Sequence, residues 1–333
     1  MSSNDVRDAA RDYGTGLVLF GILDVTVGVL YLAKTIVFLV LSLPGITALP
    51  VRYGRTEVIA TALAASPGAV FFLAIGFGSI VGRRWARSLS VAFSAVWLAV
   101  GTAATAFLFA CLPRFFAALR PLRDGSRLPL SRELVAYVVI AAVGVILPGV
   151  YFLFYRSAGV KAECERRDPE DRWSDHVPAA DLSAAVILAT GALLAFGIAF
   201  STSRQRLFFG TPLGGGIRTG VLAISILQAA AAWGICRRDL RAWPAAAAVM
   251  AIRTGANLAI ARRFAGRTLM SFAADAGPLS PDSRAAIERL EPLRPLQAAG
   301  GFVAALSIGA FLFVLWAGLR AFRGASRASR GAG

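Results

Sequence analysis

The chain has 333 residues, of which 57% are hydrophobic and only 16% are charged, whereas about a quarter are charged in an ordinary soluble domain. Its net charge of +16 would favour nucleic-acid binding in a soluble protein. Here most arginines stand between apolar runs or at their ends, where long cationic side chains reach anionic lipid headgroups. We therefore expect an integral membrane protein that contacts the lipid bilayer, and no nucleic-acid partner.

Eight runs are apolar and long enough to cross a membrane as helices, since about 20 residues span the hydrocarbon core. In chain order they are 15–44, 58–82, 88–111, 134–155, 179–201, 217–236, 242–261 and 298–320. The expected fold class is all-α, a polytopic α-helical membrane protein. Ser66-Pro67-Gly68 predicts a helix start within the second run, and Pro148 predicts a kink in the fourth.

An internal repeat is indicated by the joints between these runs. Gly82-Arg83-Arg84-Trp85-Ala86-Arg87 resembles Cys236-Arg237-Arg238-Asp239-Leu240-Arg241, and Gly101 precedes Gly255 by the same separation. Two four-helix halves that begin on the same side of the membrane would form a parallel repeat. We expect six arginines of the two joints to contact lipid headgroups: Arg83, Arg84, Arg87, Arg237, Arg238 and Arg241.

The expected organisation has five parts. They are an N-terminal tail (1–14), a first four-helix repeat (15–156), a charged linker (157–178), a second four-helix repeat (179–322) and a basic C-terminal tail (323–333). Lysine and arginine are nearly balanced between the two sides, so totals do not fix the orientation. Short loops resist translocation of positive charge most, which places both joints, the linker and both termini in the cytoplasm.

A few polar residues stand inside the apolar runs. Asp24 costs a few kcal/mol there unless it is paired or hydrated, which makes it a candidate functional residue. Arg253 has the opposite charge, and Asn257 follows one turn later. We expect a buried contact between Asp24 and Arg253 that joins the halves, as a structural ion pair or as part of a relay. Gln228 completes this candidate site.

The linker between Lys161 and His176 carries six acidic residues and the only histidine. A divalent-cation site is conceivable, because hard cations bind carboxylate oxygens. The four-residue spacings of Lys161 with Glu165, Glu163 with Arg167 and Arg167 with Asp171 favour a solvated, self-paired helix instead. Cys111, Cys164 and Cys236 lack any CxxC spacing. We therefore expect no metal, no cofactor and no disulfide framework.

The linker also carries a resemblance. The run Phe154-Tyr155-Arg156, then Val160-Lys161, Cys164-Glu165, Arg167-Asp168-Pro169, Arg172-Trp173 and Asp175 through Pro178 resembles a segment of uncharacterised bacterial multispanning membrane proteins. The resemblance implies a location in the bacterial cytoplasmic membrane and no particular activity.

Three classes of function remain open. A non-catalytic component or scaffold of a membrane assembly needs few polar residues in the membrane, and it would bind another membrane protein or a second copy of the chain. A transporter of a small solute or ion would place its site between the repeats, near Asp24, Gln228, Arg253 and Asn257. An intramembrane enzyme acting on lipid is the least supported class, because His176 has no partners suited to nucleophilic catalysis. We expect no enzymatic activity and assign no catalytic residue.

Overall fold

The computed structural model of the protein describes residues 3–41, 55–119, 130–200, 215–266, 268, 270–271, 281–291 and 295–331. The long helices are α1 (Ser3–Leu41), α2 (Arg55–Val81), α3 (Arg84–Leu119), α4 (Leu130–Ala141), α5 (Leu147–Arg156), α7 (Ala179–Phe200), α9 (Gly215–Cys236), α10 (Ala242–Ala265) and α13 (Pro295–Gly331). Shorter elements are a π turn (Ala142–Ile146), α6 (Ala158–Arg167), a 3-10 turn (Trp173–His176) and α12 (Pro281–Leu290). Every regular element in these described ranges is helical.

Within the described residues, seven helical stretches are long and apolar enough to cross a membrane, which supports the expected multi-pass helical protein. One of them, Leu134–Arg156, combines α4, the π turn and α5. The apolar part of α2, Ala65–Val81, is shorter than the others. Residues 42–44 and 201, at the ends of two expected runs, lie outside the described residues.

The helix start expected at Ser66–Gly68 is wrong, because α2 begins at Arg55 and continues through Pro67. Close packing against α1 accompanies this continuity. A Cβ atom on Gly21 would lie 2.8 Å from the carbonyl oxygen of Gly76, so the two backbones approach as only glycine allows. A neighbouring helix can hold a proline-containing segment in helical form, which a sequence pattern cannot reveal.

The distortion expected near Pro148 takes the form of the π turn that precedes α5. Proline lacks an N–H donor, and its ring crowds the carbonyl group four residues earlier, which belongs to Gly144. The π turn also meets α3 at a glycine. A Cβ atom on Gly101 would overlap the carbonyl oxygen of Gly144, so this close crossing requires both residues to remain small.

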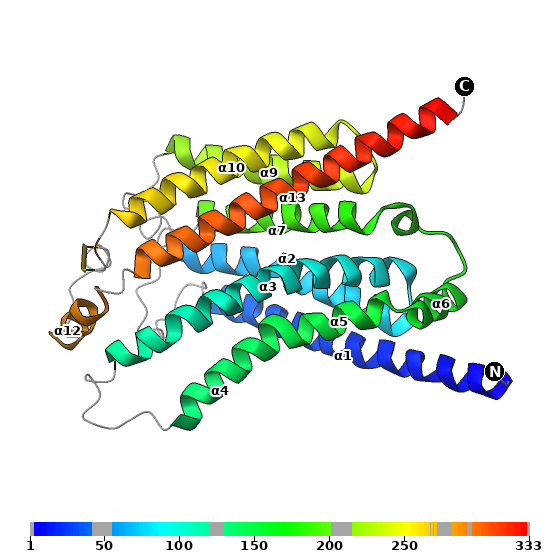
Figure 1. The fold of residues 1–333 in the computed structure, drawn as a ribbon, viewed down its shortest axis with the longest axis horizontal. Helices are drawn as coiled ribbons and strands as arrows, with labels where there is room; N and C mark the ends of the chain where they lie inside the picture. The colour runs from blue at the N-terminus through cyan, green and yellow to red at the C-terminus, as the bar shows by residue number, and fades with distance from the viewer. Residues whose placement is uncertain are drawn as a thin grey trace.

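The long helices lie side by side along the longest axis of the molecule (Figure 1). The two ends of the chain, the α2–α3 joint, the α9–α10 joint and α6 lie at one end of the bundle, and α12 lies at the opposite end (Figure 1). Each half packs its helices in the same order. α1 lies along α2, α2 contacts α3 and α3 contacts α5, while α7 lies along α9, α9 contacts α10 and α10 contacts α13.

The two halves meet through helix packing. α7 contacts both α2 and α3. A small apolar cluster of Ala92, Val177 and Leu182 fills part of this contact. Farther along the bundle, the rings of Phe107 and Phe302 stack with centroids 4.5 Å apart. Apolar contacts therefore carry the docking of the two halves at these points.

In the α2–α3 joint, the residue that follows α2 has a left-handed backbone conformation. Gly82 has φ +79°. Its N–H group donates to the carbonyl oxygen of Ser79 at 3.0 Å, and the N–H group of Arg83 donates to the carbonyl oxygen of Gly78 at 2.7 Å. This pair of bonds is the Schellman motif, which satisfies carbonyl groups at a helix end.

The α9–α10 joint has the same motif with a different residue at its centre. Arg238 has φ 60°, and its N–H group donates to the carbonyl oxygen of Ile235 at 2.9 Å. The N–H group of Asp239 donates to the carbonyl oxygen of Gly234 at 2.9 Å. The two joints therefore turn the chain by the same backbone conformation.

The motif sets the register between the joints. A Cβ atom on Gly78 would lie 2.6 Å from the Cβ atom of Ala86, and one on Gly234 would lie 2.6 Å from that of Ala242. Gly78 and Gly234 are the same distance apart in the sequence as Gly82 and Arg238. This separation is two residues longer than the one between Arg83-Arg84 and Arg237-Arg238. The recurring backbone turn therefore lies two residues out of register with the matched arginine pairs, and the internal repeat stays a prediction.

The two joints predict opposite responses to substitution. Gly82→Ala places an L-residue in a left-handed conformation, which costs about 1–2 kcal/mol. Its Cβ atom would also lie 2.5 Å from the Cδ atom of Arg167. We expect a lower melting temperature in detergent for Gly82→Ala, and an unchanged or higher one for Arg238→Gly, followed by tryptophan fluorescence. Equal stability of Gly82→Ala and the unmodified protein would contradict the strain assigned to this turn.

Candidate functional site

Two neighbouring linker residues of opposite charge bind the α2–α3 joint. Arg167 donates from Nη1 to the carbonyl oxygen of Ile80, in the last turn of α2, at 3.4 Å. The Oδ2 atom of Asp168 accepts the N–H group of Arg84, the first residue of α3, at 3.4 Å. A cation at a helix C-terminus and an anion at an N-terminus both complement the helix dipoles. We call Arg167 and Asp168 the linker clamp.

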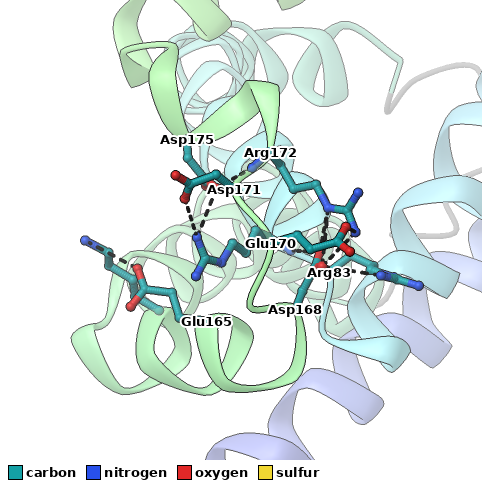
Figure 2. Close-up of polar contacts among 9 residues, drawn as sticks. Arg83, Glu165, Asp168, Glu170, Asp171, Arg172 and Asp175 are labelled. Atoms are coloured by element: carbon teal, nitrogen blue, oxygen red, sulfur yellow. Dashed lines mark hydrogen bonds and ion pairs between the residues drawn. The ribbon is translucent and has the colours of Figure 1, made fainter.

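Further ion pairs hold the linker clamp in place. Glu163 is buried and accepts hydrogen bonds from Arg166 at 2.7 Å and Arg167 at 2.6 Å. Asp168 is also buried and lies between Arg172 and Arg83, with closest N–O distances of 2.8 Å and 3.4 Å (Figure 2). Hydrogen bonds from Arg172 lower the pKa of Asp168, and those from Arg166 and then Arg167 lower the pKa of Glu163. Both carboxylates are therefore held in the ionised form.

The ion pairs in the outer part of the linker differ from those expected from the sequence. The pairs Lys161–Glu165 and Glu163–Arg167 form, but Asp171 binds Arg84 at 3.1 Å instead of Arg167. Asp175 joins the same guanidinium group at 3.4 Å, and Figure 2 shows both carboxylates pointing toward it. The expected self-paired, solvated helix is incomplete as a description, because the linker folds onto the joint. Among the described residues, no group of three or more potential metal ligands is assembled.

The remaining joint arginines have varied surroundings. Arg87 donates from Nε to the carbonyl oxygen of Tyr155 at 3.1 Å. Arg237 lies over the ring of Trp233, with its guanidinium carbon 4.8 Å from the ring centroid. Arg238 and Arg241 are exposed. Contact of the six joint arginines with lipid headgroups stays a prediction.

Polar side chains from four helices line the interior of the first half. The hydroxyl group of Tyr151 on α5 donates to Oδ1 of Asp24 on α1 at 3.2 Å, while Oδ2 of Asp24 is buried without a hydrogen-bond partner in the described structure. The hydroxyl group of Tyr155 donates to Oγ of Ser79 on α2 at 2.9 Å. Two further buried hydroxyl groups come from α3. We call this set the polar interior: Asp24, Ser79, Ser90, Ser94, Tyr151 and Tyr155.

The other expected site residues lie together in the second half. A Cβ atom on Gly191 of α7 would overlap Nη1 of Arg253 and lie 3.2 Å from Nε2 of Gln228. Gln228 is fully buried, and its Oε1 atom has no hydrogen-bond partner in the described part of the chain. Asn257 donates from Nδ2 to Oγ of Ser307 on α13 at 2.6 Å. The structure therefore groups Gln228 and Arg253, with Asn257 bound to a neighbouring helix.

The expected ion pair between Asp24 and Arg253 is not formed among the described residues. Asp24 binds Tyr151 within the first half, and Arg253 lies beside Gly191 in the second. Opposite charge suggested the pair, but α1 and α10 belong to different packed sets of helices. Sequence reasoning missed Tyr151 and Tyr155, whose four-residue spacing places both hydroxyl groups on one face of a helix within an apolar run.

The two halves differ in the polarity of the interior positions nearest their joints. In the register set by the joints, Ser79 corresponds to Ile235, Ser90 to Ala246 and Ser94 to Met250, while Arg87 corresponds to Trp243. All four second-half residues belong to one buried apolar cluster. The first half therefore carries polar groups where the second half has an ordinary apolar core.

The ionised carboxylates predict a dependence of stability on pH. A carboxylate with a lowered folded-state pKa contributes stability above its ordinary pKa of about 4, and the contribution is lost as the pH falls through the folded value. We expect Asp168→Asn to melt at a lower temperature at neutral pH and to lose less stability than the unmodified protein on acidification. Glu288→Gln, at an exposed position of α12, serves as the control and should keep the unmodified pH profile in detergent. Identical profiles for Asp168→Asn and the unmodified protein would contradict a stabilising linker clamp.

Comparisons of the chain with protein families, with curated proteins and with solved structures found no match.

Proposed function

We propose that this integral membrane protein is a non-catalytic component of a membrane assembly, and that its second half binds the transmembrane helices of a partner. The observation that carries the proposal is a set of glycines in the second half that no other helix of the described structure covers. A Cβ atom on any of them would meet nothing within 4 Å: Gly216, Gly220, Gly255, Gly301 and Gly309. Glycines at helix surfaces allow the close approach on which helix association in lipid depends.

These glycines continue into exposed small-residue faces on two helices that pack together. Ala251, Gly255 and Ala259 are exposed at four-residue spacing on α10. Gly301, Ala305 and Gly309 are exposed at the same spacing on α13. Small residues four apart lie on one side of a helix and admit a second helix closely. In the first half, by contrast, the transmembrane glycines with described surroundings have a neighbour within 4 Å, as Gly21 and Gly101 do.

The second-half faces predict a selective effect of leucine substitutions. Gly255→Leu and Gly309→Leu should leave folding intact, because the space beside each glycine is open, but should prevent close approach by a partner helix. Ala74→Leu, at an exposed position of α2, is the matched control. We expect tagged protein solubilised from its native membranes to travel as a complex larger than the 35.0 kDa chain, and the two glycine variants to lose it. A complex of unchanged size in both variants would show that these faces do not bind the partner helices.

The same proposal includes eight crossings arranged as two parallel repeats. Both ends of the chain lie at one end of the bundle, which an even number of passes produces (Figure 1). α2, which follows α1 in the chain, runs along the bundle to the joint with α3 and so counts as one of these passes (Figure 1). The matching order of helix packing and the matching joints support the repeat. The short, arginine-rich joints then favour the cytoplasmic side of a bacterial membrane for both termini.

This orientation predicts which cysteines react from each side. Cys236 lies at the α9–α10 joint, while Cys111 lies near the opposite end of α3, and both are partly exposed. In sealed vesicles with the cytoplasmic face outward, an impermeant maleimide should label Cys236 and not Cys111 until detergent is added. The reverse labelling would invert the proposed orientation.

A second candidate function, movement of protons through the first half, is supported by the polar interior. An intramembrane carboxylate is a functional-site candidate by default, since its burial is costly. Asp24 has one oxygen without a partner, and Tyr151, Tyr155 and Ser79 extend from it toward the α2–α3 joint. Ile235, Ala246 and Met250 of α9 and α10 are apolar where Ser79, Ser90 and Ser94 stand in the first half, so helices packed in this way do not require hydroxyl groups at those positions.

Proton movement would depend on Asp24. Purified protein in liposomes should dissipate an imposed pH gradient faster than empty liposomes, and Asp24→Asn should abolish the difference. Asp239→Asn removes an exposed carboxylate and should behave as the unmodified protein. A dye trapped inside the liposomes reports the internal pH. Dissipation no faster than in empty liposomes would remove this candidate and leave the assembly proposal standing.

A further inference from the structure

An open pocket of about 460 Å³ lies between the start of α3, α6, the 3-10 turn and the start of α7. Both polar and apolar side chains line it. Val91, Val177 and Leu182 form part of the apolar lining. The elements that line it, α6 and the starts of α3 and α7, lie at the end of the bundle that carries both joints (Figure 1).

The basic residues of the pocket differ in how they are paired. Arg84 binds Asp171 and Asp175, and Lys161 lies 3.7 Å from Glu165. Arg87 donates from Nε to a backbone carbonyl oxygen, and no carboxylate of the described residues lies within 4.0 Å of it. Glu165 and Asp175 attract it only from a greater distance. The terminal nitrogens of Arg87 are therefore available to an anion.

The pocket also contains a buried hydroxyl group that lacks a hydrogen bond. Ser174 lines the pocket, is only 2% exposed, and its Oγ atom has no partner in the described structure. The Nε atom of Arg84, which also lines the pocket, is buried without a partner as well. Buried polar groups are nearly always paired, because leaving one unpaired costs about 1–3 kcal/mol. Such groups point to a polar ligand atom at this place.

On the proposed repeat, the second half fills the matching position with an apolar side chain. In the register of the joints, Arg87 corresponds to Trp243, which is 4% exposed and packs within the apolar core. The ring of Trp243 lies against Gly318 of α13, where a Cβ atom would be 3.0 Å from it. An arginine in place of this tryptophan gives the first half a cation that its own fold does not use in an ion pair.

We propose that this pocket binds a phosphate group, with Arg87 as its ion-pair partner and the hydroxyl group of Ser174 as a hydrogen-bond donor. Arginine suits phosphate because its guanidinium group donates two parallel hydrogen bonds. The apolar lining of the pocket favours a phosphate that carries an acyl chain, which is an anionic phospholipid. A soluble phosphate is the other source of the same chemistry. The proposal goes beyond the assembly role and does not depend on the small-residue faces of α10 and α13.

The test measures binding to delipidated full-length protein in detergent by calorimetry. The probes are short-chain phosphatidylglycerol, inorganic phosphate and short-chain diacylglycerol, which lacks phosphate. Arg87→Gln should weaken binding of phosphatidylglycerol by about tenfold or more, as loss of a charge-assisted hydrogen bond does. Arg156→Gln, an exposed arginine at the same end of the bundle that contacts Phe152, should bind as the unmodified protein does.

The outcomes separate the sources of phosphate. Binding of inorganic phosphate as tight as that of phosphatidylglycerol, and lost in Arg87→Gln, would identify a soluble ligand for the same pocket. Diacylglycerol binding as tight as phosphatidylglycerol binding, or equal affinity in Arg87→Gln and the unmodified protein, would overturn the proposal. If Arg87→Gln does not fold, Ser174→Ala replaces it, with a several-fold weaker affinity expected and no change overturning the assignment.

Discussion

The linker clamp governs how the two halves are joined. A turn between antiparallel helices leaves carbonyl groups of one helix and N–H groups of the next without partners, so the first helix ends in a partial negative charge and the second begins with a partial positive charge. Arg167 and Asp168 meet these two ends with opposite charges. Since the next helix after the linker is α7, and α7 packs against α2 and α3, the clamp also determines where the second half begins. The pocket beside Arg87 exists because the linker is held there.

The helices of the two halves pack in the same order, but the halves differ in where their glycines and polar side chains lie. The first half places its glycines inside, where α1 crosses α2 and α3 crosses the π turn, and it carries polar side chains in its interior. The second half has a large apolar cluster that includes residues of its joint, buries Gln228 beside Arg253 and Gly191, and leaves five of its described glycines without a neighbour within 4 Å. Chemistry within one half and association through the other are therefore compatible in a single chain. The assembly role and a proton-conducting role need not exclude each other.

Hydropathy was sufficient to predict the long helices, because an apolar run of the required length has few alternatives to a membrane-spanning helix. It was not sufficient for the contacts between them. Asp24 and Arg253 were matched by charge, yet the partner of Asp24 is Tyr151. Tyr151 stands in an apolar run, where the sequence does not show which residue its hydroxyl group contacts. The alignment of the two joints by their arginines differs from the alignment of their backbone turns for a related reason. Arginines are conspicuous in the sequence, whereas the Schellman turn is recognised from hydrogen bonds at Gly82 and Arg238.

The clamp has no counterpart at the other joint, where Asp239 accepts the N–H group of Arg241 from within the turn itself. A tandem duplication of a four-helix unit yields two joints but a single connecting segment. On the proposed repeat, the ancestral unit would have had to cap its joint locally, as the second half still does. Fusion of the two genes would then have supplied the segment that became the linker. The first joint could accept a glycine and an external pair of charges only after that event.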